Sequence, residues 1–600
     1  MDERPNMDSL DRYPLRHQWL PDRPHRAYSC NGDVDAMGDE SLYRPSQLGR
    51  AYAEPDEVEA GARGDLTLTY VAGPAGVPEG ATVTFVIRGQ FPLGKAGDAE
   101  PRVSGPAHCT LEAVDRLCFR VAEGSLREGD AVTLHQPEAI WAVLAGRKEL
   151  KVVINTGDGR PEQRLPEPVV IQIRPRAAAR VEATGPCTRR AGDPVRLQVT
   201  TRDEFDNRAP LRVSGTVALG EEREDVCLRN GFDDAWLRPV GDGVARARVT
   251  VDDGLTCASN PCVTTDDLQL YVGDLHCHDY LSQAEGYTDQ VYRWALEDRN
   301  LDFISVSVQS HGWHDNEKWT LVKYMNERYL EEGRFVTFLG FEWQHSYFSD
   351  KVVHFLGGDQ PYLPVDDPRY DTPGKLYQAL EPSDALVISH HVCYPIPRWV
   401  PGVDWDVVDT QYERLVEIWS MHGSGEGYDP ADRPLKEVDP SRTAMAALRR
   451  GLRLGLVAGS DTHSARPGGS AKEPLAYWGG LAAVWAPDLT RRDVFSSLWA
   501  RRTYALTGAR IVLRMMVNDA WMGSEVPLSD RAGIQIDVWA PGDIAKVELM
   551  KDTRVLHTFT PGGDECHLEY EDVVDSPAFY HCRVTQTDGH LAVCSPVWVG

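Results

Sequence analysis

The sequence predicts an α/β domain flanked by β-rich modules, and three observations support this fold class. Between residues 271 and 510, short apolar runs typical of strands alternate with helical stretches. On both sides of that region, β-branched runs are separated by Gly, Pro or Asp clusters, which is typical of small antiparallel β modules. The chain has 600 residues, which is too long for one ordinary hydrophobic core, so several domains are expected.

The N-terminal part is predicted to be an extended arm followed by two β modules. Residues 1–60 are polar and rich in Arg, Asp and Pro, which favours an arm. Residues 61–175 and 176–270 carry strand-like runs such as TVTFVIRG and PVRLQVTTRD, and a Pro-rich stretch near residue 175 predicts the joint between two sandwich-like modules. Asp203–Asn207 supplies the residue types of a turn.

The central region, 271–510, is expected to carry the chemistry. Its strand-like runs include YVGDLH, LDFISVSV, RFVTFLGFEW, ALVISHH, RLVEIWS and RLGLVAGSD. Helices are predicted near 288–299, 315–332, 443–452 and 489–502. Repeated β/α units form parallel sheets or barrels, in which functional side chains follow the carboxyl ends of the strands. Residues 511–600 return to strand-like runs and predict a C-terminal sandwich-like module.

Composition and charge exclude several classes of function. The net charge of −28 argues against non-specific binding to a nucleic-acid backbone, and an anionic substrate would need a local positive site. No apolar run approaches the ~18 residues of a membrane span, and the first residues lack a secretion pattern, so we expect a cytoplasmic protein with no membrane partner. The 12 cysteines are scattered, which predicts free thiols rather than a disulfide framework.

Two pairs of ligand-type residues, each with one residue between its members, indicate a metal site. His276 and His278 end the strand in VGDLHCH, and Asp461 and His463 follow a later strand in AGSDTH. Because alternate residues of a strand point to the same face, each pair can direct two side chains at one ion. Imidazole and carboxylate together suit zinc, manganese or iron. Ten of the 18 histidines lie between positions 276 and 463, which favours a metalloenzyme.

Further candidates follow other strands of the same region. Glu342 ends RFVTFLGFEW, where a carboxylate is costly unless it is paired or coordinated, and it could bridge two ions. His390 and His391 are adjacent and would point to opposite faces of a strand, so only one is expected to bind, preferably His390. His422 follows RLVEIWS and is expected to contact substrate or to transfer protons, the alternative being a surface-loop histidine. Glu417, inside that strand, is expected to lie behind the ligands.

These motifs resemble those of the polymerase and histidinol phosphatase (PHP) superfamily, and most of all its DUF3604 branch, which is related to the carbaryl-hydrolase group of metallohydrolases. The matching pieces are GDLHCH, LDFISVSV, GFEW, VISHH, LVEIWSMHGSGE, GSDTH and RRTYALTGARI, within residues 271–515. The resemblance implies a distorted (β/α)7 PHP-type barrel with up to three divalent metal ions. It also implies hydrolysis of phosphoesters or of carboxyl or carbamate esters.

The second motif departs from the family's pattern. An acidic residue and a histidine usually follow the strand that here reads ISVSV, and this chain has Val308 and Gln309 at those positions. Valine cannot ligate a metal, and glutamine is a weak neutral ligand. His311, His314 and Asp315 lie just beyond and are the candidates to replace them after a loop shift.

A second departure follows the strand that ends in GFEW. The family usually has Gly-His where this chain has Ser349–Asp350, so Asp350 and His354 remain candidate ligands. A three-metal site needs nearly every ligand to hold that much charge together. The resemblance therefore implies one to three divalent ions (Zn, Mn or Fe), and the lost ligands favour one or two.

The sequence thus predicts a metal-dependent hydrolase that uses a metal-activated water on a phosphoester or a carboxyl or carbamate ester of a small molecule. Two alternatives stay open: a non-hydrolytic metal-dependent lyase or cyclase, favoured by the altered second motif, and a degenerate binding protein whose β modules hold a polysaccharide or a protein. The residues assigned to proton transfer and to binding an anionic group are His422, His311, Arg466, Arg501 and Arg510.

Overall fold

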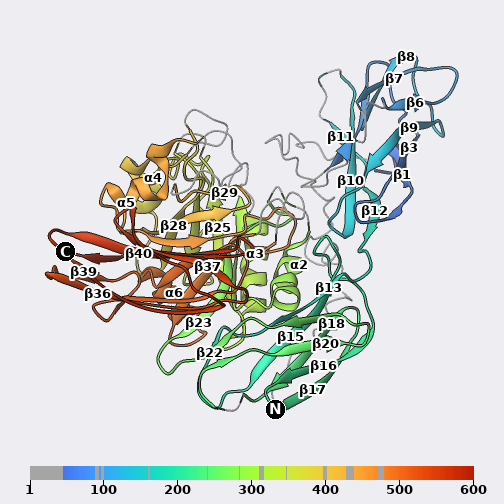
Figure 1. Ribbon diagram of the computed structural model, residues 1–600. Coiled ribbons are helices and arrows are strands. Elements are labelled where there is room, and N and C mark those ends of the chain that lie inside the picture. The colour runs from blue at the N-terminus through green and yellow to red at the C-terminus, as the bar shows by residue number, and fades with distance from the viewer. Residues whose placement is uncertain are drawn as a thin grey trace. The chain divides into compact units, whose positions relative to one another are not determined.

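The computed structural model divides the chain into two compact units, one of Met1–Ala142 and Gly146–Ile173 and the other of Val143–Ala145 and Arg174–Gly600 (Figure 1). The predicted proton-transfer residue His311 lies outside the described residues, as do His314 and Asp315. The structure describes residues 45–87, 94–95, 100–115, 117–157, 159, 162–239, 241–282, 284, 286–309, 316–345, 348–395, 402–427, 438–469 and 479–600.

The first unit consists of two mainly antiparallel sheets that follow a short helix α1 (Pro45–Leu48). One sheet contains β1 (Gly49–Glu54), β3 (Arg63–Ala72), β9 (Ala131–Ile140), β5 (Gly94–Lys95) and β6 (Arg102–Ser104). The other contains β2 (Glu57–Glu59), β12 (Val169–Arg174), β10 (Gly146–Asn155), β4 (Thr82–Ile87), β8 (Cys118–Glu123), β7 (Thr110–Asp115) and β11 (Gln163–Arg164). The segment from Gly49 onward, expected to lie in an arm, therefore pairs in a sheet.

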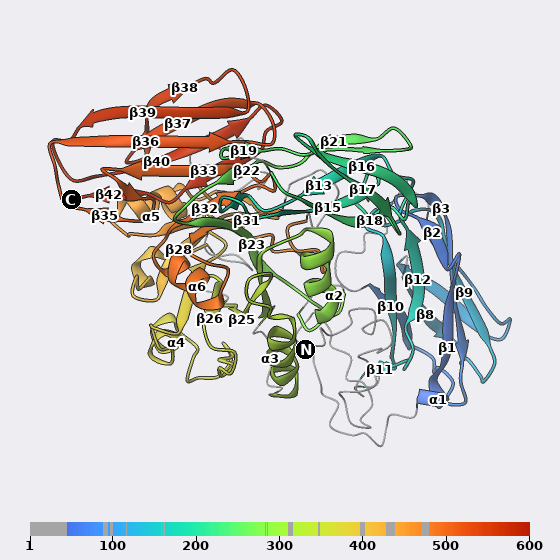
Figure 2. The same ribbon diagram turned by 90° about the horizontal axis from the view of Figure 1, so that it is seen from below.

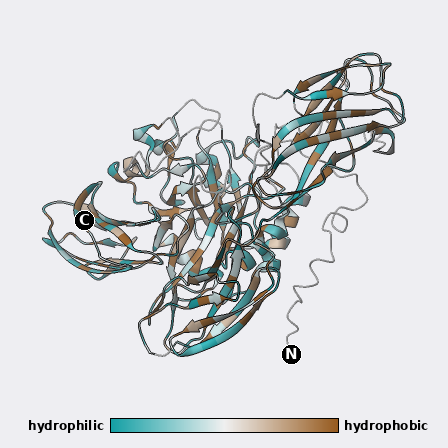
Figure 3. Ribbon diagram, turned by 45° about the vertical axis from the view of Figure 1, so that its right-hand side comes forward, coloured by the Kyte–Doolittle hydropathy of each residue, from teal (hydrophilic) through white to brown (hydrophobic). Residues whose placement is uncertain are grey.

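The second unit begins with a sandwich-like module. Its strands are β13 (Arg180–Thr184), β14 (Thr188–Arg189), β15 (Val195–Arg202), β16 (Val213–Leu219), β17 (Glu222–Leu228), β18 (Phe232–Leu237), β19 (Val244–Ala245), β20 (Arg248–Val251), β21 (Thr256–Ala258) and β22 (Cys262–Thr264). Apolar side chains of β15 and β18 share one core with those of β16, β17 and β20. Hydrophilic and hydrophobic residues alternate along such strands, as expected when one face meets a core and the other meets solvent (Figure 3).

A mixed sheet follows and carries most of the predicted site. Its strands are β23 (Gln269–Cys277), β24 (Phe303–Gln309), β25 (Val336–Trp343), β26 (Lys351–Phe355), β27 (Ala385–Ser389), β28 (Glu413–Ser420), β29 (Gly423–Ser424), β30 (Gly455–Ala458), β31 (Leu481–Ala486) and β32 (Thr503–Leu506). The pairs β23–β24, β24–β25, β27–β28 and β28–β30 are parallel. The pairs β25–β26, β26–β27 and β23–β31 are antiparallel.

The predicted (β/α)7 barrel is wrong, because the described part of the chain is mostly β-structure, with 47% of its residues in strands and 10% in helices. The central sheet also continues through β32 into strands of the C-terminal region. Apolar runs identify strands but not their direction or their partners. Parallel neighbours need a crossover of a dozen or more residues, whereas the short connection 344–350 between β25 and β26 makes that pair antiparallel.

The helices expected near 288–299, 315–332, 443–452 and 489–502 are confirmed, each within narrower bounds. Thr443 and Thr490 cap α5 and α6, each accepting a backbone N–H of the first turn. Helix α6 packs against β25, β28 and β31 (Figure 2). The helical elements are α2 (Thr288–Arg293), a π-helical segment η3 (Trp294–Asp298), α3 (Asn316–Tyr329), α4 (Pro373–Gln378), η4 (Trp405–Val407), η6 (Pro440–Arg442), α5 (Ala444–Arg449) and α6 (Arg491–Trp499).

The C-terminal region is again β-structure. A four-stranded sheet contains β34 (Ala520–Trp521), β33 (Val512–Val517), β36 (Arg531–Trp539) and β39 (Glu565–Val573). The large sheet takes in β35 (Glu525–Val526), β37 (Ile544–Lys551), β38 (Arg554–Phe559), β40 (Ala578–Gln586), β41 (Leu591–Cys594) and β42 (Val597–Val599). Among the described helices, none combines the length and the apolar character that a membrane crossing requires.

Apolar packing on both faces positions the polar ends of the central strands. Every residue of β24, β25, β27 and β30 is buried. Leu275, Phe303 and Leu415 belong to one apolar cluster of this sheet, whereas Val308 and Phe341 belong to another. Such strands read as continuous apolar runs because both faces are covered. Polar side chains at their carboxyl ends are therefore buried as well.

Candidate metal centre

Six of the eight predicted ligands lie in overlapping groups whose ligand atoms are within 4.8 Å of one another. Glu417, His391 and His422 belong to the same groups. The side chains come from β23, β25 and β28 and from the segments that follow β23, β27, β28 and β30. The six predicted ligands that the structure brings together are His276, His278, Glu342, His390, Asp461 and His463.

Backbone pairing brings the two predicted pairs side by side. Asp461 N–H donates to His276 O at 2.7 Å, and His278 N–H donates to Thr462 O at 2.9 Å. Cys277 and Thr462 form a parallel bridge between the end of β23 and the segment after β30. The two motifs, far apart in the sequence, thus direct their side chains at the same place.

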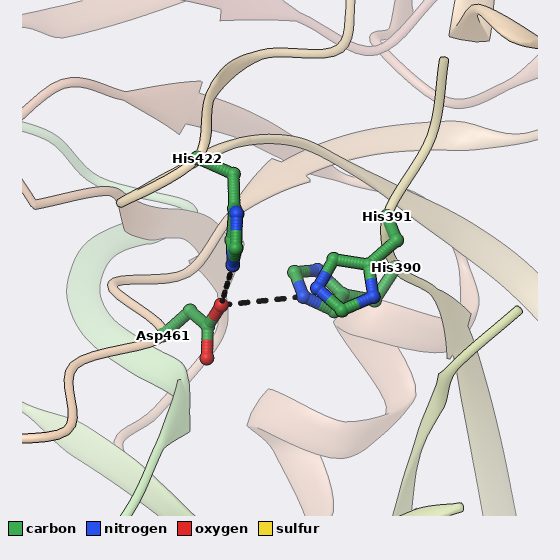
Figure 4. Close-up of side chains that lie close together, drawn as sticks. All are labelled: His390, His391, His422 and Asp461. Atoms are coloured by element: carbon green, nitrogen blue, oxygen red, sulfur yellow. Dashed lines mark ion pairs between the residues drawn. The ribbon is translucent and has the colours of Figure 1, made fainter. Parts of the chain in front are cut away.

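The carboxylate of Asp461 lies between two sets of imidazoles. Its Oδ1 is 3.0 Å from His278 Nε2 and 3.5 Å from His276 Nε2. Its Oδ2 is 2.8 Å from His422 Nε2 and 3.3 Å from His390 Nε2, and both rings point at this oxygen in Figure 4. One carboxylate therefore has an oxygen for each of two neighbouring positions.

Glu342 faces the first pair of histidines. Its Oε1 is 3.6 Å from His276 Nε2, and its Oε2 is 3.6 Å from His278 Nε2. These distances are too long for good hydrogen bonds. Two ligand atoms that are each ~2.1 Å from one ion in tetrahedral geometry lie about 3.4 Å apart. The spacing of these atoms is therefore closer to a set of metal ligands than to direct pairing.

Glu417 lies behind two of the imidazoles and orients both. Its Oε2 is 3.0 Å from His276 Nδ1, and its Oε1 is 2.7 Å from His390 Nδ1. A carboxylate at Nδ1 holds the proton on that nitrogen and leaves Nε2 as the atom that can bind a metal. The rings of His276 and His390, 4.3 Å apart between centroids, thus present Nε2 on the side of Asp461.

Backbone carbonyls hold the proton on Nδ1 of two other histidines. His278 Nδ1 donates to Ser307 O at 2.7 Å, and His463 Nδ1 donates to Asp461 O at 3.0 Å. Because a carbonyl only accepts, Nδ1 of each ring carries the proton. Nε2 is then the nitrogen of each ring that can bind a cation, although here His278 Nε2 lies 3.0 Å from Asp461 Oδ1.

Several ligand atoms of the cluster are buried without a hydrogen-bond partner. They include His276 Nε2, His390 Nε2 and Glu342 Oε2. A buried polar atom without a partner costs about 1–3 kcal/mol, and more when it is charged. A divalent cation would satisfy all three atoms at once, and imidazole with carboxylate is a donor set that zinc, manganese and iron accept. The residues therefore fit a metal ion.

The electrostatics of the cluster reflect its carboxylates. Burial opposes the charged form of His276, but Glu417 and Asp461 outweigh it and hold the pKa of His276 well above its usual range. For His390, burial is likewise outweighed, by Glu417 above all, and its pKa is raised to about 9. Burial alone would raise the pKa of Glu417, yet His390 and His276 lower it to about 2. Protons on imidazoles thus balance the carboxylates, and a metal ion would displace them.

The segment Gly459–Gly469 carries Asp461 and is held at both ends by Asp274. The carboxylate of Asp274 accepts the backbone N–H of His276 and of Ser460, each at 3.0 Å, and that of Gly468 at 2.8 Å. Burial raises the pKa of Asp274 to about 6, against these hydrogen bonds. The acidic residue of the GDLHCH motif thus organises the loop rather than joining the ligand groups.

Gly459 permits the close approach of this segment to the cluster. A Cβ atom at this position would lie 2.5 Å from Glu417 Oε2 and 2.6 Å from His276 Cβ. Both distances are shorter than van der Waals contact. A larger residue would displace the imidazole or its carboxylate partner.

His390 and His391 both lie at the cluster, contrary to the expectation from strand alternation. Strand β27 ends at Ser389, and His391 has a positive φ of 56°. The alternation of a strand therefore no longer applies, and the two rings lie 3.8 Å apart between centroids. His391 belongs to the group formed by His390, His422 and Asp461 (Figure 4).

Two predicted ligands, Asp350 and His354, are in none of the ligand groups found in the described residues. His354 Nδ1 is 2.9 Å from Ser305 Oγ, and burial lowers its pKa to about 3. Asp350 Oδ2 is 3.1 Å from His391 Nδ1. Burial and then the charge of Glu342 raise the pKa of Asp350 well above its usual value.

The arginines predicted to bind an anionic substrate are engaged with other parts of the protein. Arg501 and Arg510 each donate to backbone carbonyls, and Arg466 donates to Asn207 Oδ1 and to Ala145 O. These contacts are structural. The assignment of Arg466 and Arg510 to substrate binding therefore has no support in the geometry.

Sequence reasoning missed Tyr394 and gave no place to Gln309. Tyr394 OH is 2.6 Å from His422 Nδ1. Gln309 Nε2 is 3.4 Å from His463 Nε2, whereas Val308 is buried in an apolar cluster. Tyr394 follows the strand ALVISHH by only a few residues, but no spacing rule links a tyrosine to a histidine that comes one strand later.

Comparison with known proteins gives a family match and relatives without an established function. The family described as "Protein of unknown function (DUF3604)" matches residues 469–533, which confirms the DUF3604 prediction for that segment. An uncharacterized protein of Chlamydia pneumoniae is 28% identical over 366 residues, covering 56% of this chain and 58% of its own length. One of Chlamydia muridarum is 28% identical over 380 residues, covering 57% and 59%. The chain thus spans less than two thirds of the length of these relatives.

Solved structures resemble the chain only distantly. The adhesin InvE of Yersinia pseudotuberculosis shares 14% identity over 36% of this chain and 59% of its own, with a TM-score of 0.15. A β-glucuronidase of Parabacteroides merdae shares 9% identity over 90% of this chain and 79% of its own, with a TM-score of 0.17. Scores this low carry no argument about fold or activity.

Proposed function

We propose that this protein is a metal-dependent hydrolase that acts on a phosphoester or on a carboxyl or carbamate ester of a small molecule. The observation that carries the proposal is the convergence of imidazole Nε2 atoms on Asp461 and Glu342, with buried ligand atoms that have no hydrogen-bond partner. The resemblance of the motifs to PHP-superfamily metallohydrolases and to the carbaryl-hydrolase group supports the same reaction class.

One to three divalent ions, of Zn, Mn or Fe, fit the donor set, and the arrangement around Asp461 favours two. The first position would be held by His276, His278, Glu342 and Asp461, and the second by Asp461, His390 and His391, with His422 beside them. A metal ion bound in such a site lowers the pKa of a bound water toward ~7 and polarises the scissile group.

The residues around the cluster support proton transfer at its more accessible side. The side chains of His422 and His463 are 19% and 20% exposed, whereas those of the other paired residues are nearly fully buried. His422 lies between Tyr394 OH and Asp461 Oδ2, so both ring nitrogens have a partner that can hold or release a proton. Hydrolysis adds a hydroxyl to the acyl or phosphoryl group and a proton to the leaving oxygen, and we assign the transfer of that proton to His422.

The experiment is metal analysis of the full chain, purified after growth with Mn²⁺, Zn²⁺ or Fe²⁺, together with a panel of phosphomonoesters, phosphodiesters, carboxyl esters and carbamates. We expect bound metal and activity on one ester class. His276→Ala should lose both, whereas His581→Leu, which changes a buried histidine of the C-terminal region, should keep both.

Other outcomes would overturn the proposal in different ways. Full activity in His276→Ala would exclude this cluster as the site. Bound metal without hydrolysis of any ester would favour the lyase or cyclase alternative. Metal content near zero in supplemented medium would favour a binding protein.

A further inference from the structure

The segment Gly459–Gly469 has a strained backbone. Asp461 and Ala465 have positive φ angles of 52° and 57°. Left-handed conformations are unfavourable for non-glycine residues and persist only where surrounding contacts impose them. Asp274 holds the two ends of the segment through Ser460 and Gly468. The turn between Asp461 and Gly468 needs a further restraint.

Arg466 supplies contacts in the middle of the segment. Its Nη1 donates to Asn207 Oδ1 at 2.8 Å, and its Nη2 donates to Ala145 O at 2.6 Å. Its guanidinium carbon lies 4.6 Å from the centre of the Trp294 ring. A guanidinium that donates to two fixed acceptors and stacks on an aromatic face is held in one orientation.

The acceptors of Arg466 are themselves fixed. Asn207 is 1% exposed, and its Nδ2 donates to Val143 O at 2.8 Å and to Asp203 Oδ2 at 2.9 Å. Ala145 N–H donates to Asn207 Oδ1 at 2.7 Å. Asp203, fully buried, also accepts the backbone N–H of Asn207. The turn Asp203–Asn207 is therefore a rigid platform with its own closed set of hydrogen bonds.

Trp294, the third contact of Arg466, is held from another side. Arg202 is buried, lies 5.6 Å from the Trp294 ring, and donates to the carbonyl of Asp298 and to Glu182. Trp294 begins η3, directly after α2. Arg466 thus links the segment behind the metal cluster to η3 and to the sandwich-like module that contains the turn.

We propose that Arg466 is a positioning residue that, through the Asp203–Asn207 turn, holds the segment Gly459–Gly469 so that Asp461 and His463 face the metal. The proposal rests on the proposed function for the ligand roles of these two residues. It assigns the sandwich-like module a role in the site, because the acceptor that Arg466 needs is a side chain of that module.

Arg510 is a matched control for Arg466. Both donate to uncharged oxygen acceptors, and Arg510 donates to the carbonyls of Gly185, Arg299 and Asn300. Arg510 therefore also ties the sandwich-like module to the region of η3. It follows β32 and has no contact with the segment Gly459–Gly469 among the interactions of the described residues.

The experiment compares Arg466→Met, Arg466→Lys, Asn207→Ala and Arg510→Met in the full chain. Two quantities are measured: amide hydrogen exchange of the peptide 459–469 in metal-free protein, and the Kd for Mn²⁺ and Zn²⁺ by competition with a chelator. We expect Arg466→Met and Asn207→Ala to speed exchange in this peptide and to raise Kd, by at most the roughly 10–100-fold that loss of a direct outer partner of a metal ligand costs. Arg466→Lys keeps one donor, so its exchange rate and its Kd should fall between those of the wild type and those of the other two variants.

For Arg510→Met we expect a lower melting temperature with unchanged Kd and unchanged exchange in the peptide. Wild-type exchange and Kd in Arg466→Met would overturn the proposal, and so would equal effects of Arg466→Met and Arg510→Met. If Arg466→Met does not fold, the exchange rates and Kd values of Arg466→Lys and Asn207→Ala test the proposal in its place. If the wild type binds no metal, the proposed function fails, whereas the exchange data still decide whether Arg466 holds the segment.

Discussion

Lys351 and Glu413 form a buried ion pair in the same sheet that carries the candidate metal cluster. Lys351 Nζ is 2.6 Å from Glu413 Oε1, and both side chains are 0% exposed. Glu413 also accepts hydrogen bonds from Tyr377 OH and Ser389 Oγ. One cation thus balances one carboxylate, and none of the four side chains has a buried polar atom without a partner.

The candidate metal cluster lies on neighbouring strands and has no such fixed cation. Glu342, Glu417 and Asp461 share no lysine or arginine among their ion-pair partners in the described residues. Protonated imidazoles compensate for the charge, and several ligand atoms stay without a partner. The comparison teaches that buried charge alone does not mark a site. The cluster differs from the pair in that several of its buried ligand atoms have no hydrogen-bond partner in the protein.

The largest effect is expected from removing the carboxylate at the centre of the cluster. Asp461→Asn removes the carboxylate that faces His278 and His276 with one oxygen and His390 and His422 with the other. Metal content and hydrolysis should fall by more than the roughly 10–100-fold that an outer partner is worth. Elemental analysis and initial rates measure this. Retained metal together with retained activity would show that Asp461 is not a ligand.

Breaking the Lys351–Glu413 pair should lower the free energy of unfolding and leave metal binding unchanged. Lys351→Met leaves the carboxylate of Glu413 buried without its cation, which costs about 3–5 kcal/mol. Denaturant unfolding measures the loss. The double variant Lys351→Met/Glu413→Gln should recover part of it, because no buried charge remains. The metal stoichiometry of the folded fraction should be unchanged in both variants, and a lost metal would contradict the separation of the two clusters.

A smaller effect on metal affinity is expected from Glu417, which lies behind the candidate ligands. Glu417→Gln removes the charge that holds the protons on Nδ1 of His276 and His390. Metal affinity should fall about 10–100-fold while the stoichiometry at saturation is kept. Affinity should also become less sensitive to acid, because the pKa of His276 and of His390 is raised chiefly by Glu417 against burial. An unchanged Kd would assign Glu417 to packing alone.

The smallest effect concerns a buried histidine outside the cluster. His581 is fully buried, neither ring nitrogen has a hydrogen-bond partner, and burial lowers its pKa to about 3. An unfolded histidine titrates near 6.5, so between these values the unfolded state binds the extra proton, and stability falls as pH falls. His581→Leu should remove about 1.4 kcal/mol of this loss per pH unit below about pH 6.

Unfolding free energies measured from pH 7 to 4 check this prediction. The exposed His557, changed to Gln, is the control for replacing a histidine outside the core. Parallel curves for the wild type and His581→Leu would contradict a neutral buried His581.

Local sequence pattern predicted the strands, the main helices and six of the ligand-type residues that the structure brings to the cluster. It failed where the outcome depended on non-local pairing. Strands β26 and β31 run antiparallel to β25 and β23, as loop length and the available partner strands require. The predicted barrel of parallel strands is therefore wrong. The assignment of only one of His390 and His391 failed because a positive φ at His391 ended the alternation.

The sequence by itself determined which side chains stand at strand ends, because the residue spacing of a strand decides which face each side chain takes. His276 with His278 follows from that rule, whereas Asp461 and His463 lie beyond the end of β30, and the positive φ of Asp461 breaks strand alternation there. Only the tertiary structure decided that the two pairs share one site, through the Cys277–Thr462 bridge. Only the tertiary structure placed Arg466 on Asn207 of another module. Hydrogen bonds between residues more than 180 positions apart leave no periodic trace in the sequence, and chain folding alone brings their partners together.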